Sequence, residues 1–128
     1  MGEQIKVLVL DDEQTVCERL KDYFEKKGIS VETYNEPQKA LERLKEKTFD
    51  VIVTDLKMKG PTGIDVLVEV KKESYKSEVI IITGYGSFET FRQAEYVGAY
   101  DFIAKPFQMS EIYKLVKKAA SKARKHSK

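Results

Sequence analysis

Short apolar runs, each followed by a polar or charged residue, are the feature of this sequence that most constrains its fold. They occupy residues 7–10, 51–54, 79–82 and 101–104, and the first three consist almost entirely of valine, leucine and isoleucine. Runs this short, with apolar residues at consecutive positions, are typical of parallel strands that are buried on both faces. The sequence therefore predicts four strands of this kind in one sheet.

The stretches between these runs carry apolar residues at helical spacing. Their apolar positions are Val16, Leu20 and Phe24; Ala40, Leu41 and Leu44; Ile64, Leu67 and Val70; Phe88, Phe91 and Val97; and Ile112, Leu115 and Val116. We expect Gly28 to end the first helix, Pro37 to begin the second and Ser110 to cap the last. Residues 30–34 alternate weakly and predict an edge-like strand, which brings the number of strands to five.

Five strands that alternate with five helices predict an open, doubly wound α/β fold with a five-stranded parallel sheet. Right-handed crossovers place the helices on both faces of such a sheet. Five strands are too few to close the eight-stranded α/β barrel. A length of 128 residues predicts one domain over residues 1–128, with a core over about 5–123 and a basic helix end or linker over 120–128.

Charge and cysteine content exclude several classes of partner and location. The net charge of +2 is too small to predict binding to nucleic acid or to an anionic membrane. The lysines after Glu111 are interpreted as a solvated helix end rather than a DNA-binding arm. Cys17 is the only cysteine, so it is interpreted as a buried small side chain without an internal disulfide. With no apolar stretch long enough to span a bilayer, a cytoplasmic protein is expected.

The polar residues that follow the apolar runs predict a binding site. Asp11 and Asp12 follow the first run, Asp55 the second, Thr83 the third and Lys105 the fourth. Because the carboxyl ends of parallel strands meet at one edge of the sheet, these side chains should converge in a crevice there. Three carboxylates in one place repel one another unless a cation intervenes. The alternatives, a helix cap, a turn aspartate and a solvated lysine, each explain one residue but not the convergence.

The order of these residues resembles the receiver domain of two-component response regulators, over about residues 5–123. The motifs that carry the resemblance are Asp-Asp-Glu at 11–13, Asp55, Pro61 with Gly63, Thr83-Gly84, and Lys105-Pro106-Phe107. The resemblance implies a flavodoxin-like fold with strand order 2-1-3-4-5. Residues 83–87 look most like the receivers of transcriptional activators.

The resemblance also implies a reaction and a cofactor. Asp55 is expected to accept a phosphoryl group from the phosphohistidine of a sensor histidine kinase, giving an acyl phosphate. Mg²⁺ would be held directly by Asp12 and Asp55, through water by Asp11, and by the backbone carbonyl of Lys57. The protein would catalyse its own phosphorylation and dephosphorylation without being a turnover enzyme.

Other residues receive supporting roles by the same resemblance. Lys105 would pair with phosphoryl oxygens, Thr83 would donate its hydroxyl to one of them, and the Lys105–Pro106 bond would be cis. Thr83 and Phe102 would form a switch that alters the face made by the fourth helix, fifth strand and fifth helix. The candidate contact residues on this face, equally well interpreted as edges of the core, are Tyr96, Tyr100 and Tyr113. That face would serve an output domain, a partner protein or a homodimer.

Three other functions are consistent with parts of the pattern. An aspartate-nucleophile phosphatase of the haloacid dehalogenase type needs a second acid two residues after the nucleophile, where this chain has Lys57. A flavodoxin-like electron carrier is disfavoured because the loop after the first strand is acidic and would repel a flavin phosphate. A receiver-like interaction module that is never phosphorylated is the remaining alternative, and the intact set of Asp12, Asp55, Thr83 and Lys105 argues against it.

Overall fold

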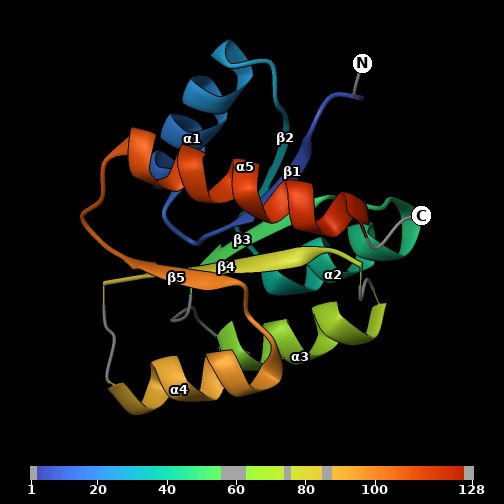
Figure 1. The fold of residues 1–128 in the computed structure, drawn as a ribbon, viewed down its shortest axis with the longest axis vertical. Coiled ribbons are helices and arrows are strands. Elements are labelled where there is room, and N and C mark those ends of the chain that lie inside the picture. The colour runs from blue at the N-terminus through green and yellow to red at the C-terminus, as the bar shows by residue number, and fades with distance from the viewer. Residues whose placement is uncertain (1–2, 56–62, 74–75, 85–87, 126–128) are drawn as a thin grey trace.

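The computed structural model describes residues 3–55, 63–73, 76–84 and 88–125, which form a five-stranded parallel sheet between two layers of helices (Figure 1). The strands are β1 Lys6–Leu10, β2 Ser30–Tyr34, β3 Val51–Asp55, β4 Glu78–Thr83 and β5 Asp101–Ala104. The helices are α1 Gln14–Lys26, α2 Pro37–Glu46, α3 Gly63–Glu73, α4 Phe88–Val97 and α5 Met109–Lys125. The strand order is β2-β1-β3-β4-β5, which confirms the predicted topology.

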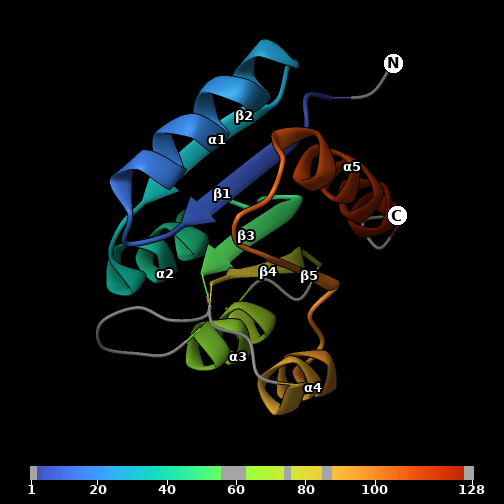
Figure 2. The ribbon, with the colours of Figure 1, turned by 90° about the vertical axis from the view of Figure 1, so that its left-hand side faces the viewer.

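The two faces of the sheet bury two separate cores. Helices α1 and α5 cover one face, while α2 and α3 cover the other (Figure 2). Along β1, Val7 and Val9 join the core beneath α1 and α5, whereas Leu8 and Leu10 join the core beneath α2 and α3. Successive side chains of a strand point to opposite faces. A strand with helices on both sides is therefore apolar at every position, which explains the runs in the sequence.

The helix boundaries agree with the sequence in two places and differ in one. Helix α1 ends two residues before Gly28, which has φ +83°, and α2 begins at Pro37. The prediction that Ser110 caps the last helix is wrong, because α5 begins at Met109. The N–H of Gln108, the residue before the helix, donates to the Glu111 carboxylate at 3.0 Å, the contact that a glutamate in the first turn makes back to the start of a helix.

Strand β5 departs from the expectation that four strands are buried on both faces. Its residues Asp101, Phe102 and Ile103 are half-buried and Ala104 is exposed. The reason is position: β5 lies at the edge of the sheet and pairs only with β4. Strands β3 and β4, which have neighbours on both sides, are buried throughout. Within the described residues, no helix has the length and apolarity that crossing a membrane requires.

Strand β2, at the other edge, is tied to α2 by a cluster of charges. The Glu32 carboxylate accepts hydrogen bonds from Arg43 Nε at 2.8 Å, Lys47 Nζ at 2.8 Å and the Tyr34 hydroxyl at 2.9 Å. The Arg43 guanidinium is the main cause, with Lys47 and Tyr34, of a pKa for Glu32 lowered from 4.5 to about 2, against the opposing effect of burial. The cluster therefore fixes a carboxylate in its charged form at the sheet edge.

This lowered pKa predicts a pH dependence of stability. A carboxyl whose folded-state pKa lies below its unfolded value stabilises the fold above pH 4.5, and that contribution disappears as the pH falls through about 2. We expect Glu32→Gln to lower the free energy of unfolding by about 1–2 kcal/mol at pH 6, and by progressively less towards pH 2. Urea unfolding of both proteins across this range is the measurement. A difference between them that does not change with pH would contradict the prediction.

Candidate functional site

Asp11, the first residue after β1, is held in place by hydrogen bonds with residues around β2 and around the start of α1. Its backbone N–H donates to the Tyr34 carbonyl at 3.0 Å, and its carbonyl accepts from the Asn35 side-chain amide at 2.9 Å. The Cys17 thiol also donates to this carbonyl, at 3.4 Å, and burial, followed by the charge of Asp11, raises the pKa of Cys17 to about 11. The Glu13 N–H donates to Asp11 Oδ1 at 2.8 Å. Cys17 is thus a buried, protonated donor, and Asp11 is fixed before any ligand arrives.

The second carboxylate oxygen of Asp11 has no hydrogen-bond partner among the described residues, although Lys105 Nζ lies 3.0 Å away. Burial raises the pKa of Asp11, and the nearby charge of Asp55 adds to that rise, while the Glu13 N–H and Lys105 oppose it. Carboxylate oxygens of Asp11, Asp12 and Asp55 lie within 4.8 Å of one another. Asp11 and Asp55 are buried and Asp12 is exposed.

These oxygens fit a divalent cation. A buried carboxylate oxygen without a hydrogen bond and three hard oxygen donors within reach of one ion are the environment that Mg²⁺ prefers. The exposed side of the group, at Asp12, leaves room for the water ligands that Mg²⁺ usually keeps. Lys57, whose backbone carbonyl was the fourth predicted ligand, lies outside the described residues.

Lys105, the first residue after β5, brings a positive charge to these acids. Its Nζ lies 2.7 Å from Glu13 Oε1, 2.8 Å from Asp55 Oδ2 and 3.0 Å from Asp11 Oδ2. Burial alone would lower the pKa of Lys105, but its contacts with Asp55, Glu13 and Asp11 together raise it above the usual value for lysine. The lysine is therefore a permanent cation at the centre of the site. The peptide bond between Lys105 and Pro106 is cis, as the resemblance implied.

The backbone of β4 and β5 places Thr83 and Phe102 close to this edge. Thr83 is 1% exposed at the end of β4, and its carbonyl accepts from the Lys105 N–H at 2.8 Å. Phe102 is half-buried on β5 and pairs in register with Ile81. The structure thus brings Asp11, Asp12, Asp55, Thr83 and Lys105 to one edge of the sheet, as the sequence predicted.

Comparison with known proteins identifies the family. Residues 7–117 match the model of the response regulator receiver domain. The chain belongs to that family. It is 32% identical over 123 residues to the transcriptional regulatory protein ZraR of Klebsiella oxytoca. The aligned region covers 96% of this chain but 28% of ZraR. The chain spans about a quarter of the length of the curated relatives it matches.

Solved structures of receiver domains agree with this assignment. A receiver domain protein from Clostridium thermocellum is 31% identical, with a TM-score of 0.88 over 94% of this chain and 97% of that one. The beryllofluoride-activated NtrC4 receiver domain dimer is 35% identical, with a TM-score of 0.87 over 92% of this chain and 98% of that one. The fold and order of strands in this receiver domain are therefore those of its relatives.

Two residues near the acids were missed as contributors from sequence. Glu13 was counted only as part of the Asp-Asp-Glu motif, yet it makes the shortest contact to Lys105. Asn35, in the connection after β2, was not singled out, yet its amide donates to the Asp11 carbonyl. The position of Glu13 next to the acidic pair could have indicated from sequence that it lies near the site. No sequence feature indicates the role of Asn35, because that role depends on the pairing of β1 with β2.

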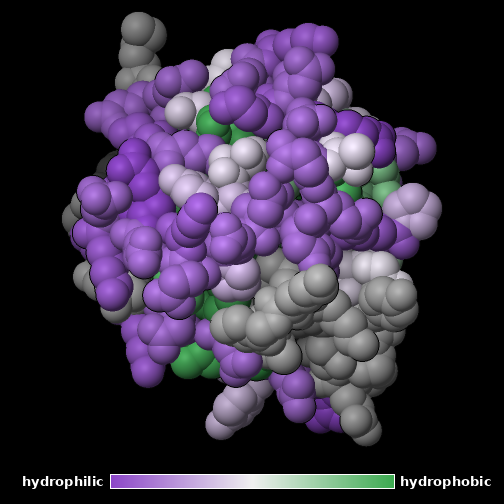
Figure 3. Space-filling model, turned by 180° about the vertical axis from the view of Figure 1, so that it is seen from behind, coloured by the Kyte–Doolittle hydropathy of each residue, from purple (hydrophilic) through white to green (hydrophobic). Residues whose placement is uncertain are grey.

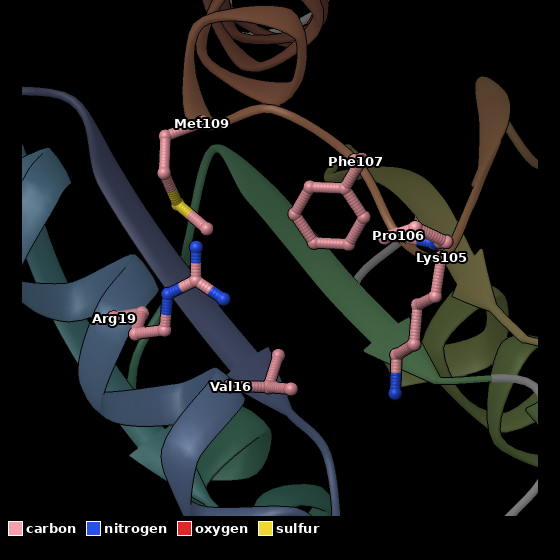
Figure 4. A pocket seen from close by; sticks show the side chains of 6 residues that line it. All are labelled: Val16, Arg19, Lys105, Pro106, Phe107 and Met109. Carbon is pink, nitrogen blue, oxygen red and sulfur yellow. The ribbon is translucent and has the colours of Figure 1, made fainter.

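A hollow of about 290 Å³ opens beside the site of this receiver domain, between α1 and the connection from β5 to α5 (Figure 4). Its lining combines apolar side chains with two cations and consists of Val16, Arg19, Lys105, Pro106, Phe107 and Met109. Lys105 lines the hollow and also contacts Asp55. The hollow is therefore continuous with the acidic site through this one side chain.

Proposed function

We propose that this receiver domain accepts a phosphoryl group on Asp55 from the phosphohistidine of a sensor kinase. The observation that carries the proposal is the Asp55 carboxylate itself: it is 5% exposed, 2.8 Å from the Lys105 ammonium, and grouped with two further acids. A buried carboxylate that contacts a cation is a competent oxygen nucleophile. No observation among the described residues favours the phosphatase or the unphosphorylated interaction module.

Each residue of the site has a distinct role in the proposed transfer. An Asp55 oxygen attacks phosphorus, the bond from phosphorus to the histidine nitrogen breaks with its electron pair on nitrogen, and the imidazole leaves neutral with the proton that its other ring nitrogen already carries. Lys105 offers its N–H groups to the phosphoryl oxygens, whose charge must be stabilised throughout. Thr83, at the end of β4, offers a hydroxyl to the same group. Asp11, Asp12 and Asp55 would hold Mg²⁺, which when bound neutralises charge between the donor and the acids.

We also propose where the phosphoryl donor binds and what this receiver domain controls. Lys105 lines the hollow beside Val16 and Phe107 and contacts Asp55, which supports this hollow as the surface that a kinase would contact. The curated relatives are transcriptional regulators about four times as long as this chain, which supports an output domain or partner that this receiver controls.

The test of phosphoryl acceptance is the mass of the intact chain after incubation with acetyl phosphate and Mg²⁺. We expect a gain of one phosphoryl group, which chelation of the metal prevents. An unchanged mass, with the fold intact by circular dichroism, would overturn the proposed function.

The phosphoryl group is proposed to act on the face formed by α4, β5 and α5. Thr83 is buried at the end of β4 and Phe102 is half-buried on β5, which supports their proposed role as the switch. Tyr96 is 94% exposed on α4, whereas Tyr100 and Tyr113 pack against the core beneath α1 and α5. The dimer of the related NtrC4 receiver supports a homodimer here. We expect beryllofluoride with Mg²⁺ to shift sedimentation from monomer to dimer; a monomer under both conditions would contradict this.

A further inference from the structure

Glu13 stands apart from the other partners of Lys105 in its exposure. The Glu13 side chain is 57% exposed, against 7% for Asp55 and 0% for Asp11. It nevertheless makes the shortest of the three contacts, at 2.7 Å. Lys105 Nζ donates hydrogen bonds to Glu13 and to Asp55, and it lies 3.0 Å from Asp11 Oδ2 in an ion pair. Three acids therefore hold the lysine before any phosphoryl group arrives.

A phosphoryl group on Asp55 would compete with these three acids for the lysine. Asp11 cannot move, because its backbone is held by Tyr34 and Asn35 and its carboxylate by the Glu13 N–H. Moving either buried acid away from Lys105 would leave an unpaired charge without water, which is unfavourable. The Glu13 carboxylate can turn into solvent and be hydrated instead, so it is the partner that yields.

Charge points to the same residue. Glu13 adds a negative group at the exposed mouth of a site whose proposed substrate is an anion, and it accepts a hydrogen bond from the lysine that the anion would also contact. The face behind Figure 1 carries hydrophilic side chains over most of its described surface (Figure 3), so exposure alone does not single out Glu13. What distinguishes Glu13 is its direct contact with the lysine, across 92 positions of sequence.

We propose that Glu13 is a positioning residue that holds Lys105 in the unphosphorylated site and releases it to the phosphoryl oxygens, so that the contact slows phosphorylation. This inference rests on the proposed function, since it concerns the rate at which Asp55 is modified. It makes the α1 N-terminus a determinant of how readily this receiver responds to its donor.

Glu13→Gln tests the inference, because the amide keeps the shape of the side chain and removes the charge. We expect phosphorylation by acetyl phosphate and Mg²⁺, followed by intact mass, to be roughly 2- to 5-fold faster than in wild type, the range of an exposed ion pair. Glu18→Gln is the matched control: it removes the same charge from α1, the helix that Glu13 precedes, where Glu18 contacts Gln14. The increase should become smaller at about 1 M salt, where the screening length is about 3 Å, because the Glu13 side chain is exposed.

A second measurement reports on the lysine without any phosphoryl transfer. In NMR spectra of the ¹⁵N-labelled ammonium groups, Glu13→Gln should make the Lys105 ammonium group more mobile and its protons faster to exchange with water. Glu18→Gln should leave both properties unchanged. If wild type is phosphorylated but both variants match its rate and its Lys105 resonance, the role of Glu13 is overturned and the proposed function stands. If wild type gains no phosphoryl group, the proposed function fails and the inference fails with it.

Discussion

Replacing Asp55 with asparagine is expected to abolish phosphoryl uptake from acetyl phosphate. The amide has almost the same shape as the carboxylate but lacks the negative oxygen that attacks phosphorus, so the reaction loses its nucleophile while the fold is retained. The substitution also removes one of three acids around the cation site, so Mg²⁺ should bind more weakly. Intact mass measures the first effect, and titration calorimetry with Mg²⁺ measures the second.

The matched control for this experiment is Asp22→Asn. Asp22 is an exposed aspartate on α1 that pairs with Lys26 and lies outside the acidic group. This variant should gain one phosphoryl mass at the wild-type rate. A mass gain in Asp55→Asn would instead place the acceptor on another side chain, and peptide mapping would identify it. Loss of uptake in both variants would point to a general effect of charge rather than to the chemistry of Asp55.

Most of the sheet and the acidic site could be predicted from sequence because both depend on local patterns. Residues 7–10 and 51–54 are apolar at nearly every position, since helices cover both faces, and the acids follow at strand ends. Parallel strands bring those ends together whatever the details of packing. The same rule overestimated the burial of β5. Its apolar composition does not show that the strand lies at the edge of the sheet, with one neighbouring strand.

The contacts that tune the site could not be predicted in this way. Glu13 and Lys105 lie at opposite ends of the sequence, and whether they touch depends on the paths of two loops rather than on any spacing. The Asn35 side-chain amide donates to the Asp11 carbonyl, and it reaches that carbonyl because β1 pairs with β2, a pairing that the residue type at position 35 does not reveal. Ser110 does not cap α5 because the helix begins one residue earlier, at Met109, and the Glu111 carboxylate instead accepts from the Gln108 N–H before it.

Replacing Lys105 with methionine is expected to destabilise the metal-free protein by about 3 kcal/mol, because it leaves buried carboxylates without their cation. Asp11 and Asp55 are 0% and 5% exposed, and Lys105 is the cation that contacts both among the described residues. Methionine preserves much of the length of the side chain, so the change tests charge rather than packing. Urea unfolding in the presence of a chelator gives the free energy directly.

Magnesium should reverse much of this loss, and that reversal separates a charge effect from damage to the fold. Without the ammonium, the acids have one competitor fewer for the metal, so Mg²⁺ should bind Lys105→Met more tightly than wild type and raise its stability more at equal concentration. Lys118→Met, on the exposed face of α5, should change stability by less than about 0.5 kcal/mol, with the wild-type response to Mg²⁺. Equal stabilisation of all three proteins by Mg²⁺ would mean that the lysine and the metal do not share these carboxylates, and the electrostatic account of the site would have to be abandoned.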